Sequence, residues 1–361
     1  MKPNIKIQFI IIFLIFLFSC GYETHVINTV HEDGSITRKV IVKSDKTDFN
    51  PKVHRVPIDS TWQTDITYDV DTKNDTTWIF TAEKYFTNVE ELNKEYNNDI
   101  GANSTMQRSA GFSKNFRWFT TKFRFNETIE KVLTISCPMS DFFTDEELKM
   151  IYLPDFVQQE LENGVDSLRI KEIIESIEEK FGFWMWTSFV RQWIQIFYDM
   201  YGDHPDLKIN KEEMQLKESQ AVNYLIEDED DKDSGDMAQF FISVLGEEFL
   251  KTFETEIDSS ISVLEDKSGA FWAANNYDVE IRMPGRVIAS NGFTDTDPDT
   301  EGGRGILWTV TGEYFLTQTY EMWAESQLSN YWTWIVTAMF IIFVITGFVI
   351  RSKKAKVEPH K

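Results

Sequence analysis

The chain has 361 residues, of which 42% are hydrophobic and 14% aromatic, and its formal net charge is −23 at pH 7. This length suffices for one large or two ordinary domains. The acidic balance disfavours nucleic acid and anionic lipid headgroups and would favour cations or basic partners, but solubility is the interpretation of the charge that we favour. Two cysteines cannot supply a disulfide framework, so the stability of the chain must come from a hydrophobic core.

Residues 1–19 have the pattern of a signal peptide. Lys2 and Lys6 precede a short apolar run at residues 7–18. A charged start with an apolar core of this length is typical of a secretory signal rather than of a membrane span. The run ends in Leu-Phe-Ser-Cys, which resembles the lipobox of bacterial lipoproteins, and the resemblance implies that Cys20 carries a diacylglycerol. The alternative is an ordinary signal peptide with an incidental cysteine.

Residues 20–137 are predicted to be rich in β-strands. Asp33 and Gly34 lie between two stretches in which apolar and polar residues alternate, and this arrangement is a strong indication of a β-hairpin. Further strands are expected at residues 66–70, 76–82, 115–125 and 131–136, with one short helix at residues 88–96. The first third of the chain should therefore be mainly antiparallel sheet.

Residues 138–270 have apolar positions that recur every three or four residues, which indicates helices. Thr144 and Glu147 have the spacing of a capping box at a helix start. Longer helices are expected at about residues 166–200, 211–226 and 237–253. The sequence therefore predicts a large helical insertion after the first strands.

Residues 271–330 return to the alternation of a strand. Pro284 and Gly285 are predicted to form a turn between two strands, and another strand is expected at residues 305–310, with a continuation at residues 313–319. A sheet that begins before the helices and is completed after them implies an α+β fold, mainly antiparallel, with the helices packed beside the sheet. The alternative is that the helices form a separate domain.

Residues 279–292 and 306–310, followed by an apolar helix with a basic tail, resemble the C-terminal part of LppM-type envelope lipoproteins. The shared pattern is a strand, a Pro-Gly turn, a strand that ends in Asn-Gly, and a strand with a tryptophan. It is carried here by Met283, Pro284, Gly285, Val287, Asn291, Gly292 and Trp308. The resemblance implies an α+β envelope domain with room for an amphiphile-binding groove and without a catalytic residue. The long helical insertion departs from the family pattern.

Residues 331–350 are a predicted transmembrane helix. They contain no formal charge, and at a rise of about 1.5 Å per residue they span about 30 Å, the thickness of the hydrocarbon core of a bilayer. The basic tail at residues 351–361 marks the cytoplasmic end by the positive-inside rule. We expect a single-pass protein of the cytoplasmic (inner) membrane with residues 20–330 outside the cytoplasm. A buried core helix of a soluble protein is the alternative.

Two acidic clusters are candidate cation sites. The first contains seven carboxylates at residues 227–236, and we interpret it as a solvated linker. The second places carboxylates at alternate positions, as calcium ligands often are, but it lacks the glycine and the glutamate of an EF-hand loop. We therefore favour a charged hairpin tip over a calcium site for Asp295, Asp297, Asp299 and Glu301.

Residues 181–201 contain nine aromatic side chains, several of them at helical spacing. Core packing of the insertion against the sheet is the favoured interpretation, because aromatic residues dominate core burial. The alternative is an apolar groove or membrane-facing surface that binds an amphiphile. The ligand-binding candidates on this stripe are Trp186, Phe189, Trp193 and Phe197.

The sequence contains none of the common catalytic or nucleotide-binding motifs, so no catalytic residue and no cofactor are predicted. The first hypothesis for function is a non-enzymatic envelope lipoprotein that binds lipid or protein partners. Its membrane contacts would be the lipid on Cys20 and the helix at residues 331–350. The alternatives are an envelope enzyme that uses paired carboxylates, and a calcium-binding envelope protein.

Overall fold

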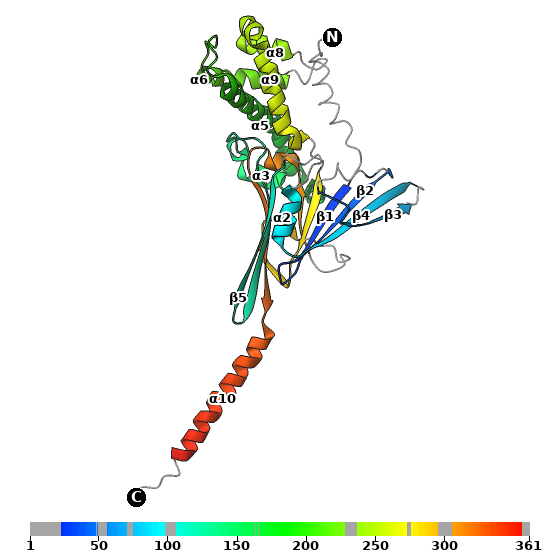
Figure 1. Cartoon of the computed structure of the whole chain (residues 1–361), viewed down its shortest axis with the longest axis vertical. Helices are drawn as coiled ribbons and strands as arrows, with labels where there is room; N and C mark the ends of the chain where they lie inside the picture. Colours follow the sequence, from blue (N-terminus) through cyan, green and yellow to red (C-terminus); the bar gives the residue numbers. More distant parts are fainter. Residues whose placement is uncertain are drawn as a thin grey trace.

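The computed structural model describes most of the chain from Glu23 to Ala355. The described residues are 23–47, 49, 56–70, 75–97, 106–162, 164, 166–227, 237–272, 276–294 and 305–355. The predicted signal peptide with Cys20 lies outside them. Figure 1 shows two β-sheets in the middle of the molecule, a group of helices at one end and a long C-terminal helix at the other. The predicted α+β class is confirmed.

Sheet A has seven strands among the described residues. In spatial order they are β3 (Gln63–Val70), β4 (Thr76–Phe86), β2 (Ile36–Ser44), β1 (Glu23–Val30), β7 (Tyr277–Arg282), β10 (Ile306–Val310) and β9 (Phe293–Thr294). Neighbouring strands are antiparallel except β1 and β7, which are parallel. β1 and β2 form the predicted hairpin, and Gly34 in its turn has a φ of 93°, a conformation that glycine adopts without strain.

Sheet B is antiparallel and has the order β5 (Arg108–Arg117), β6 (Thr120–Ile129), β11 (Tyr320–Ser329) and β8 (Arg286–Ser290). β5 and β6 form a hairpin whose two-residue turn is Trp118 and Phe119. The stretch predicted as strand at residues 115–125 therefore contains a chain reversal.

Two strand predictions in this part of the chain are wrong. The segment at residues 131–136 is irregular, because the N–H groups of Val132 and Leu133 donate at 2.8 Å to carbonyl groups at the end of the 3-10 helix η3 (Gly312–Phe315) instead of to a strand. The expected continuation at residues 313–319 is replaced by η3 itself. The chain then enters β11, which the sequence analysis missed.

The predicted turn at Pro284 and Gly285 is a corner between the two sheets. β7 before it belongs to sheet A and β8 after it belongs to sheet B. Gly285 has a φ of 78°, and a Cβ there would lie 2.7 Å from the carbonyl oxygen of Gln327. Only glycine fits this corner without strain. Both sheets thus combine strands from before and after the helical segment.

The two sheets share a hydrophobic core with α2 (Val89–Asn97). Sheet A contributes branched and aromatic side chains such as Val40 and Trp308, sheet B contributes Phe125, and α2 contributes Leu92. Each of these side chains is at most 3% exposed. Full burial of one large apolar side chain contributes about 1.5–3 kcal/mol, so this shared core is the main reason that the sheets pack together.

The helical lobe consists of the helices between residues 145 and 272. They are α3 (Asp145–Ile151), α4 (Asp155–Glu162), α5 (Ser167–Tyr201), α6 (Lys211–Gln215), α7 (Glu218–Glu227), α8 (Met237–Leu245) and α9 (Glu247–Trp272). The predicted capping box of Thr144 and Glu147 is confirmed at the start of α3. The predicted long helix is confirmed as α5.

Two of the predicted helices are divided. The helix expected at residues 211–226 is interrupted between α6 and α7. The helix expected at residues 237–253 is interrupted at Gly246, whose φ of 94° is incompatible with a helix interior, and α9 continues beyond the predicted end to Trp272.

A second cluster of buried residues joins the helical lobe to the sheets. It combines Trp184 and Phe189 of α5 with Leu133, Cys137 and Leu316, which lie in the segments after β6 and after η3. Trp184 is fully buried, and its Nε1 donates to the carbonyl oxygen of Cys137 at 3.1 Å. The lobe is therefore packed on the rest of the molecule rather than connected only by the chain.

α10 (Tyr331–Ala355) follows β11 with only Asn330 between them. Figure 1 shows that it extends away from the sheets, at the opposite end of the molecule from the helical lobe. Residues 331–352 are long and apolar enough to cross a membrane, with a mean hydropathy of 2.4, and only 6% of the apolar window is buried. An interior helix of a soluble protein would be mostly buried, so this alternative does not describe α10.

Candidate functional site

The aromatic stripe of α5 forms the core of the helical lobe. Phe189, Trp193 and Phe197 are 5%, 7% and 0% exposed, and Trp186 is half-buried. Trp193 packs on Phe241 at 5.1 Å between ring centroids. These residues are buried, as the core-packing interpretation predicts, but Trp193 and Phe197 pack against other helices of the lobe rather than against a sheet. Phe189 belongs to the cluster that joins the lobe to the sheets.

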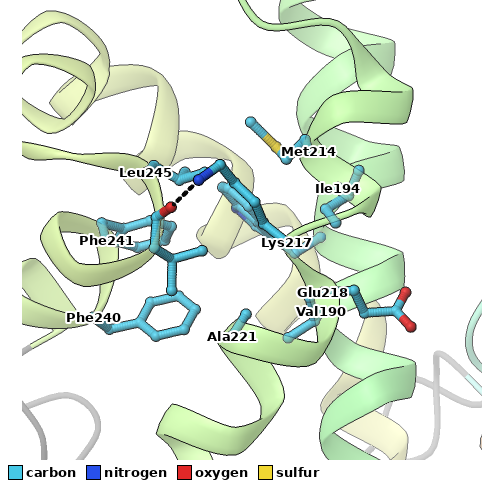
Figure 2. A pocket seen from close by; sticks show the side chains of 11 residues that line it. Val190, Ile194, Met214, Lys217, Glu218, Ala221, Phe240, Phe241 and Leu245 are labelled. Atoms are coloured by element: carbon cyan, nitrogen blue, oxygen red, sulfur yellow. Dashed lines mark hydrogen bonds between the residues drawn. The ribbon is translucent and has the colours of Figure 1, made fainter.

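The cavity beside this stripe is small and apolar. Figure 2 shows it between α5, α6, α7 and α8, with Phe240 and Phe241 on one side and Ile194 on another. Lys217 reaches across it and donates from Nζ to the carbonyl oxygen of Val244 at 2.8 Å. Its volume is about 10 Å³, which is the room of one water molecule. An acyl chain does not fit in it.

The predicted cation ligands Asp295, Asp297, Asp299 and Glu301 lie outside the described residues. The same holds for residues 228–236 of the first acidic cluster. Within the described part of the chain, no three His, Cys, Asp or Glu side chains are arranged to hold a metal ion. The favoured interpretations, a solvated linker and a charged hairpin tip, and the calcium alternative therefore all remain predictions.

Cys137 is a buried thiol at the base of the helical lobe. Burial raises the pKa of this thiol above its usual range, although Arg191 lies beside it with its Nη1 3.5 Å from Sγ. The guanidinium of Arg191 is held by both carboxylate oxygens of Glu218, at 2.7 and 2.8 Å. A thiol with a raised pKa is a poor nucleophile, so this group has a packing role.

Asn291, Gly292 and Trp308, which belong to the pattern of strands and turns described in the sequence analysis, lie together at the edge of sheet A. Asn291 accepts a hydrogen bond from Nε1 of Trp308 at 3.3 Å and another from the backbone N–H of Trp323 at 2.8 Å. A Cβ at Gly292 would lie 2.3 Å from the Trp308 ring, so the glycine allows the tryptophan to pack on the backbone. These contacts give the pattern a structural role.

The most distinctive constellation is the junction between the β5–β6 hairpin and α10, which the sequence analysis did not identify. Three large side chains at the hairpin tip are exposed although they are aromatic: Phe116 by 53%, Trp118 by 48% and Phe119 by 37%. They contact the aromatic start of α10. The Phe119 and Trp334 rings are 4.3 Å apart between centroids, and Trp332 lies 5.7 Å from Trp118.

Polar contacts fix this junction. Asn330 donates from Nδ2 to the carbonyl oxygen of Arg117 at 2.8 Å, and its backbone N–H donates to the carbonyl oxygen of Phe119 at 2.9 Å. Its Oδ1 accepts from the hydroxyl of Thr121 at 2.9 Å. Further along α10, Nε1 of Trp118 donates to Oγ1 of Thr337 at 2.9 Å. The hairpin tip is therefore attached to the first turns of α10.

Charge is distributed unevenly along the molecule. Residues 138–270, which include the helical lobe, contain 32 carboxylates and 11 basic side chains, a balance of −21 out of a total of −23. Residues 100–126, which include the hairpin tip, contain five basic side chains and no Asp or Glu. The end of the molecule away from α10 is thus strongly acidic, and the hairpin beside α10 is basic.

Comparison with protein-family models, with curated proteins and with solved structures finds no match to this chain.

Proposed function

We propose that this chain is a membrane-anchored envelope lipoprotein that acts as a non-catalytic protein-interaction module, with residues 20–330 outside the cytoplasm. The observation that carries the proposal is α10, which is exposed along its length, is apolar enough to cross a membrane and has basic residues in its last turn. The lipobox-like end of the predicted signal peptide and the resemblance to LppM-type lipoproteins support the same placement.

The helical lobe is the part that would meet a partner. It lies at the far end of the molecule from α10 (Figure 1) and carries almost all of the net negative charge. Electrostatic attraction over such a surface accelerates association with a basic protein, and the effect weakens as salt rises. Because the cavity beside the aromatic stripe holds about 10 Å³, a protein partner is favoured over an amphiphile inside the lobe.

Anchoring is tested by membrane extraction. The full chain, a chain that ends at Asn330, a Cys20→Ser variant and the combination of the two changes are expressed in a bacterial host, and the membranes are washed with high salt. We expect the full chain and each single variant to stay with the membranes and the combined variant to be released. Retention of the combined variant would contradict the proposal.

The interaction role is tested by photo-crosslinking from the lobe. Leu168 and Leu216 are 78% and 84% exposed in the lobe, so a photoreactive residue at either position should not disturb the fold. We expect a discrete, salt-sensitive protein adduct from at least one of these positions and none from the matched position Tyr68, which is 60% exposed on β3. Absence of any lobe-specific adduct would count against an interaction role for the lobe.

A further inference from the structure

We propose that the β5–β6 hairpin tip is a second membrane contact, in which Phe116, Trp118 and Phe119 enter the outer interface of the bilayer beside α10 and the neighbouring basic residues bind anionic lipid headgroups. This inference rests on the proposed membrane anchoring of α10. It adds a site on the folded body that touches lipid and sets the orientation of that body on the membrane.

The first argument is the depth of the Trp118 side chain. Nε1 of Trp118 bonds to Thr337, which lies six residues after Tyr331, the first residue of α10. At about 1.5 Å per residue, this bond lies about 9 Å along the helix from its start. If residues 331–352 span the bilayer, a side chain attached at that level is inside the membrane boundary, because the polar interface on each side is only about 5–8 Å thick.

The second argument is the type of side chain at the tip. Phe116, Trp118 and Phe119 are exposed together at one hairpin end, and a contiguous exposed aromatic patch marks a surface that meets another apolar phase. Trp332 and Trp334 in the first turn of α10 are 54% and 56% exposed and lie against the same tip. Tryptophan is enriched at the level of the headgroups, where its ring is amphipathic. The aromatic side chains of the tip and of the first turn of α10 therefore form one patch at the level expected for the headgroups.

The third argument is the hydrogen bonding of the tip. At the boundary of the hydrocarbon core, where water is scarce, the polar groups of a turn need hydrogen-bond partners within the protein. The carbonyl oxygens of Arg117 and Phe119 both accept hydrogen bonds from Asn330, and Nε1 of Trp118 donates to Thr337. The polar groups nearest to α10 are thus bonded within the protein.

The fourth argument is the local charge. Lys114, Arg117 and Lys122 lie within the last residues of the hairpin, and residues 100–126 contain no carboxylate. Arg117 and Lys122 lie on one face of the hairpin and Lys114 on the other, because side chains alternate along a strand. Nζ of Lys114 donates to the carbonyl oxygen of Glu32 at 2.9 Å, so Lys114 adds positive charge near the tip while Arg117 and Lys122 are the direct headgroup ligands. Basic side chains at a membrane surface are attracted to anionic headgroups, whereas the acidic lobe is held at the opposite end of the molecule.

The test places a fluorescent label at the tip in the full chain. A Cys20→Ser background leaves the buried Cys137 as the only native thiol. An environment-sensitive dye is attached through Arg117→Cys at the tip, Tyr68→Cys on β3 as the exposed control, or Ile342→Cys, which lies at the middle of the apolar span of α10 and is 62% exposed. Each chain is reconstituted into vesicles of phosphatidylcholine, or of equal parts phosphatidylcholine and phosphatidylglycerol, that contain lipids with a spin label near the headgroup or deep in the acyl chain.

We expect quenching of the label at position 117 by the headgroup-proximal spin label to be several-fold stronger than at position 68, and the label at position 342 to be quenched by the deep spin label. Adding Trp118→Ala and Phe119→Ala should move the signal at position 117 toward that of the control. Adding Lys114→Gln and Lys122→Gln should reduce quenching at position 117 in the phosphatidylglycerol vesicles and leave it unchanged in phosphatidylcholine alone.

The outcomes separate this inference from the anchoring proposal. If position 342 is quenched and position 117 behaves as position 68 does, α10 spans the membrane but the hairpin stays in water, and the inference is overturned. If neither position is quenched, the anchoring proposal fails as well. If the two lysine substitutions have no effect in either lipid, the assignment of the anionic headgroup as the ligand is overturned.

Discussion

Arg38 on β2 of sheet A donates from its guanidinium to the carboxylate of Glu127 on β6 of sheet B, so a buried ion pair joins the two sheets. The Arg38 side chain is 1% exposed and the Glu127 side chain is 9% exposed. The hydroxyl of Tyr96 on α2 donates to the same carboxylate at 2.9 Å, and Nε of Arg38 donates to Oδ1 of Asn28 at 2.7 Å. Both charges are therefore largely removed from bulk water.

Glu127→Gln should destabilise the protein by about 3 kcal/mol, because removal of one partner leaves the other charge buried without compensation. The free energy of unfolding of the full chain in detergent measures this. Lys43→Gln is the matched control, since Lys43 and Glu23 form a surface pair at 3.6 Å with side chains 52% and 82% exposed, and such pairs contribute about 0–1 kcal/mol. Equal effects of the two substitutions would show that the ion pair of Arg38 and Glu127 does not hold the sheets together.

Glu147 should make the helical lobe sensitive to acid. Burial acts to raise the pKa of this carboxyl, but hydrogen bonds from Lys180, Ser176 and Thr144 outweigh it and lower the pKa from 4.5 to about 2. The stabilisation is therefore present above pH 4.5 and is lost as the pH falls from 4.5 toward 2. We expect Glu147→Gln to cost about 2 kcal/mol at pH 7, a value below the full linkage energy because solvent screens part of the interaction.

The melting temperatures of both proteins from pH 7 to pH 2 measure this effect. The difference between them should shrink as the pH falls below 4.5. Melting curves that stay parallel over the whole range would contradict a low pKa for Glu147.

Trp193→Ala should unfold the helical lobe rather than impair a binding groove. Trp193 is 7% exposed, and its Nε1 donates to Oγ of Ser260 on α9 at 2.9 Å. Truncation of a buried tryptophan costs about 3–5 kcal/mol. Near-ultraviolet circular dichroism and limited proteolysis of the lobe measure the loss. Leu168→Ala, on the exposed side of α5, should change stability by less than about 0.5 kcal/mol. A folded Trp193→Ala lobe that lost only lipid binding would restore the groove hypothesis.

Asn330→Ala should loosen the hairpin from α10. The substitution removes the side-chain hydrogen bonds to Arg117 and Thr121 and keeps the backbone bond to Phe119. At about 1 kcal/mol per bond, the local opening free energy should fall by about 2 kcal/mol. Hydrogen exchange of the amides at residues 115–121 measures this opening. Asn115→Ala, a substitution of an exposed asparagine on the same hairpin, should leave the exchange rates unchanged. Similar rates for both variants would show that Asn330 does not fix the junction.

Local signals in the sequence predicted the elements whose structure is decided by nearby residues. The turn at Asp33 and Gly34 and the capping box of Thr144 and Glu147 each depend on contacts within a few positions, and both were predicted correctly. The sequence also predicts the helix α5 correctly. Apolar residues recur at helical spacing along its 35 residues, and this signal depends on no distant partner.

Predictions failed where distant contacts decide the structure. Residues 131–136 alternate like a strand, but their backbone groups bond to a segment more than 180 positions away. The corner at Pro284 and Gly285 looks like a hairpin turn in sequence, since no local signal tells which sheet the second strand joins. The break at Gly246 was missed because an isolated glycine is often tolerated within a helix.

The candidate site was predicted only in part. The aromatic stripe was recognised, but its burial depends on α8 and α9, which lie far along the chain. The turn at Trp118 and Phe119 contains no Gly, Asn, Asp or Pro, so it carried no turn signal. The clue that was available is the run of residues 100–126 without a carboxylate in an otherwise acidic chain. The negative net charge of the whole chain comes mainly from the helical lobe, and it conceals the positive local charge of this hairpin.

The single residue between β11 and α10 leaves no flexible joint between the sheets and the C-terminal helix. A spanning helix adjusts its tilt to the thickness of the bilayer, and with this connection any change in tilt must rotate the sheets as well. The lobe lies at the far end of the molecule (Figure 1), so this rotation would displace it sideways more than any other part of the described chain. Membrane thickness would thereby govern where above the bilayer the acidic lobe can reach.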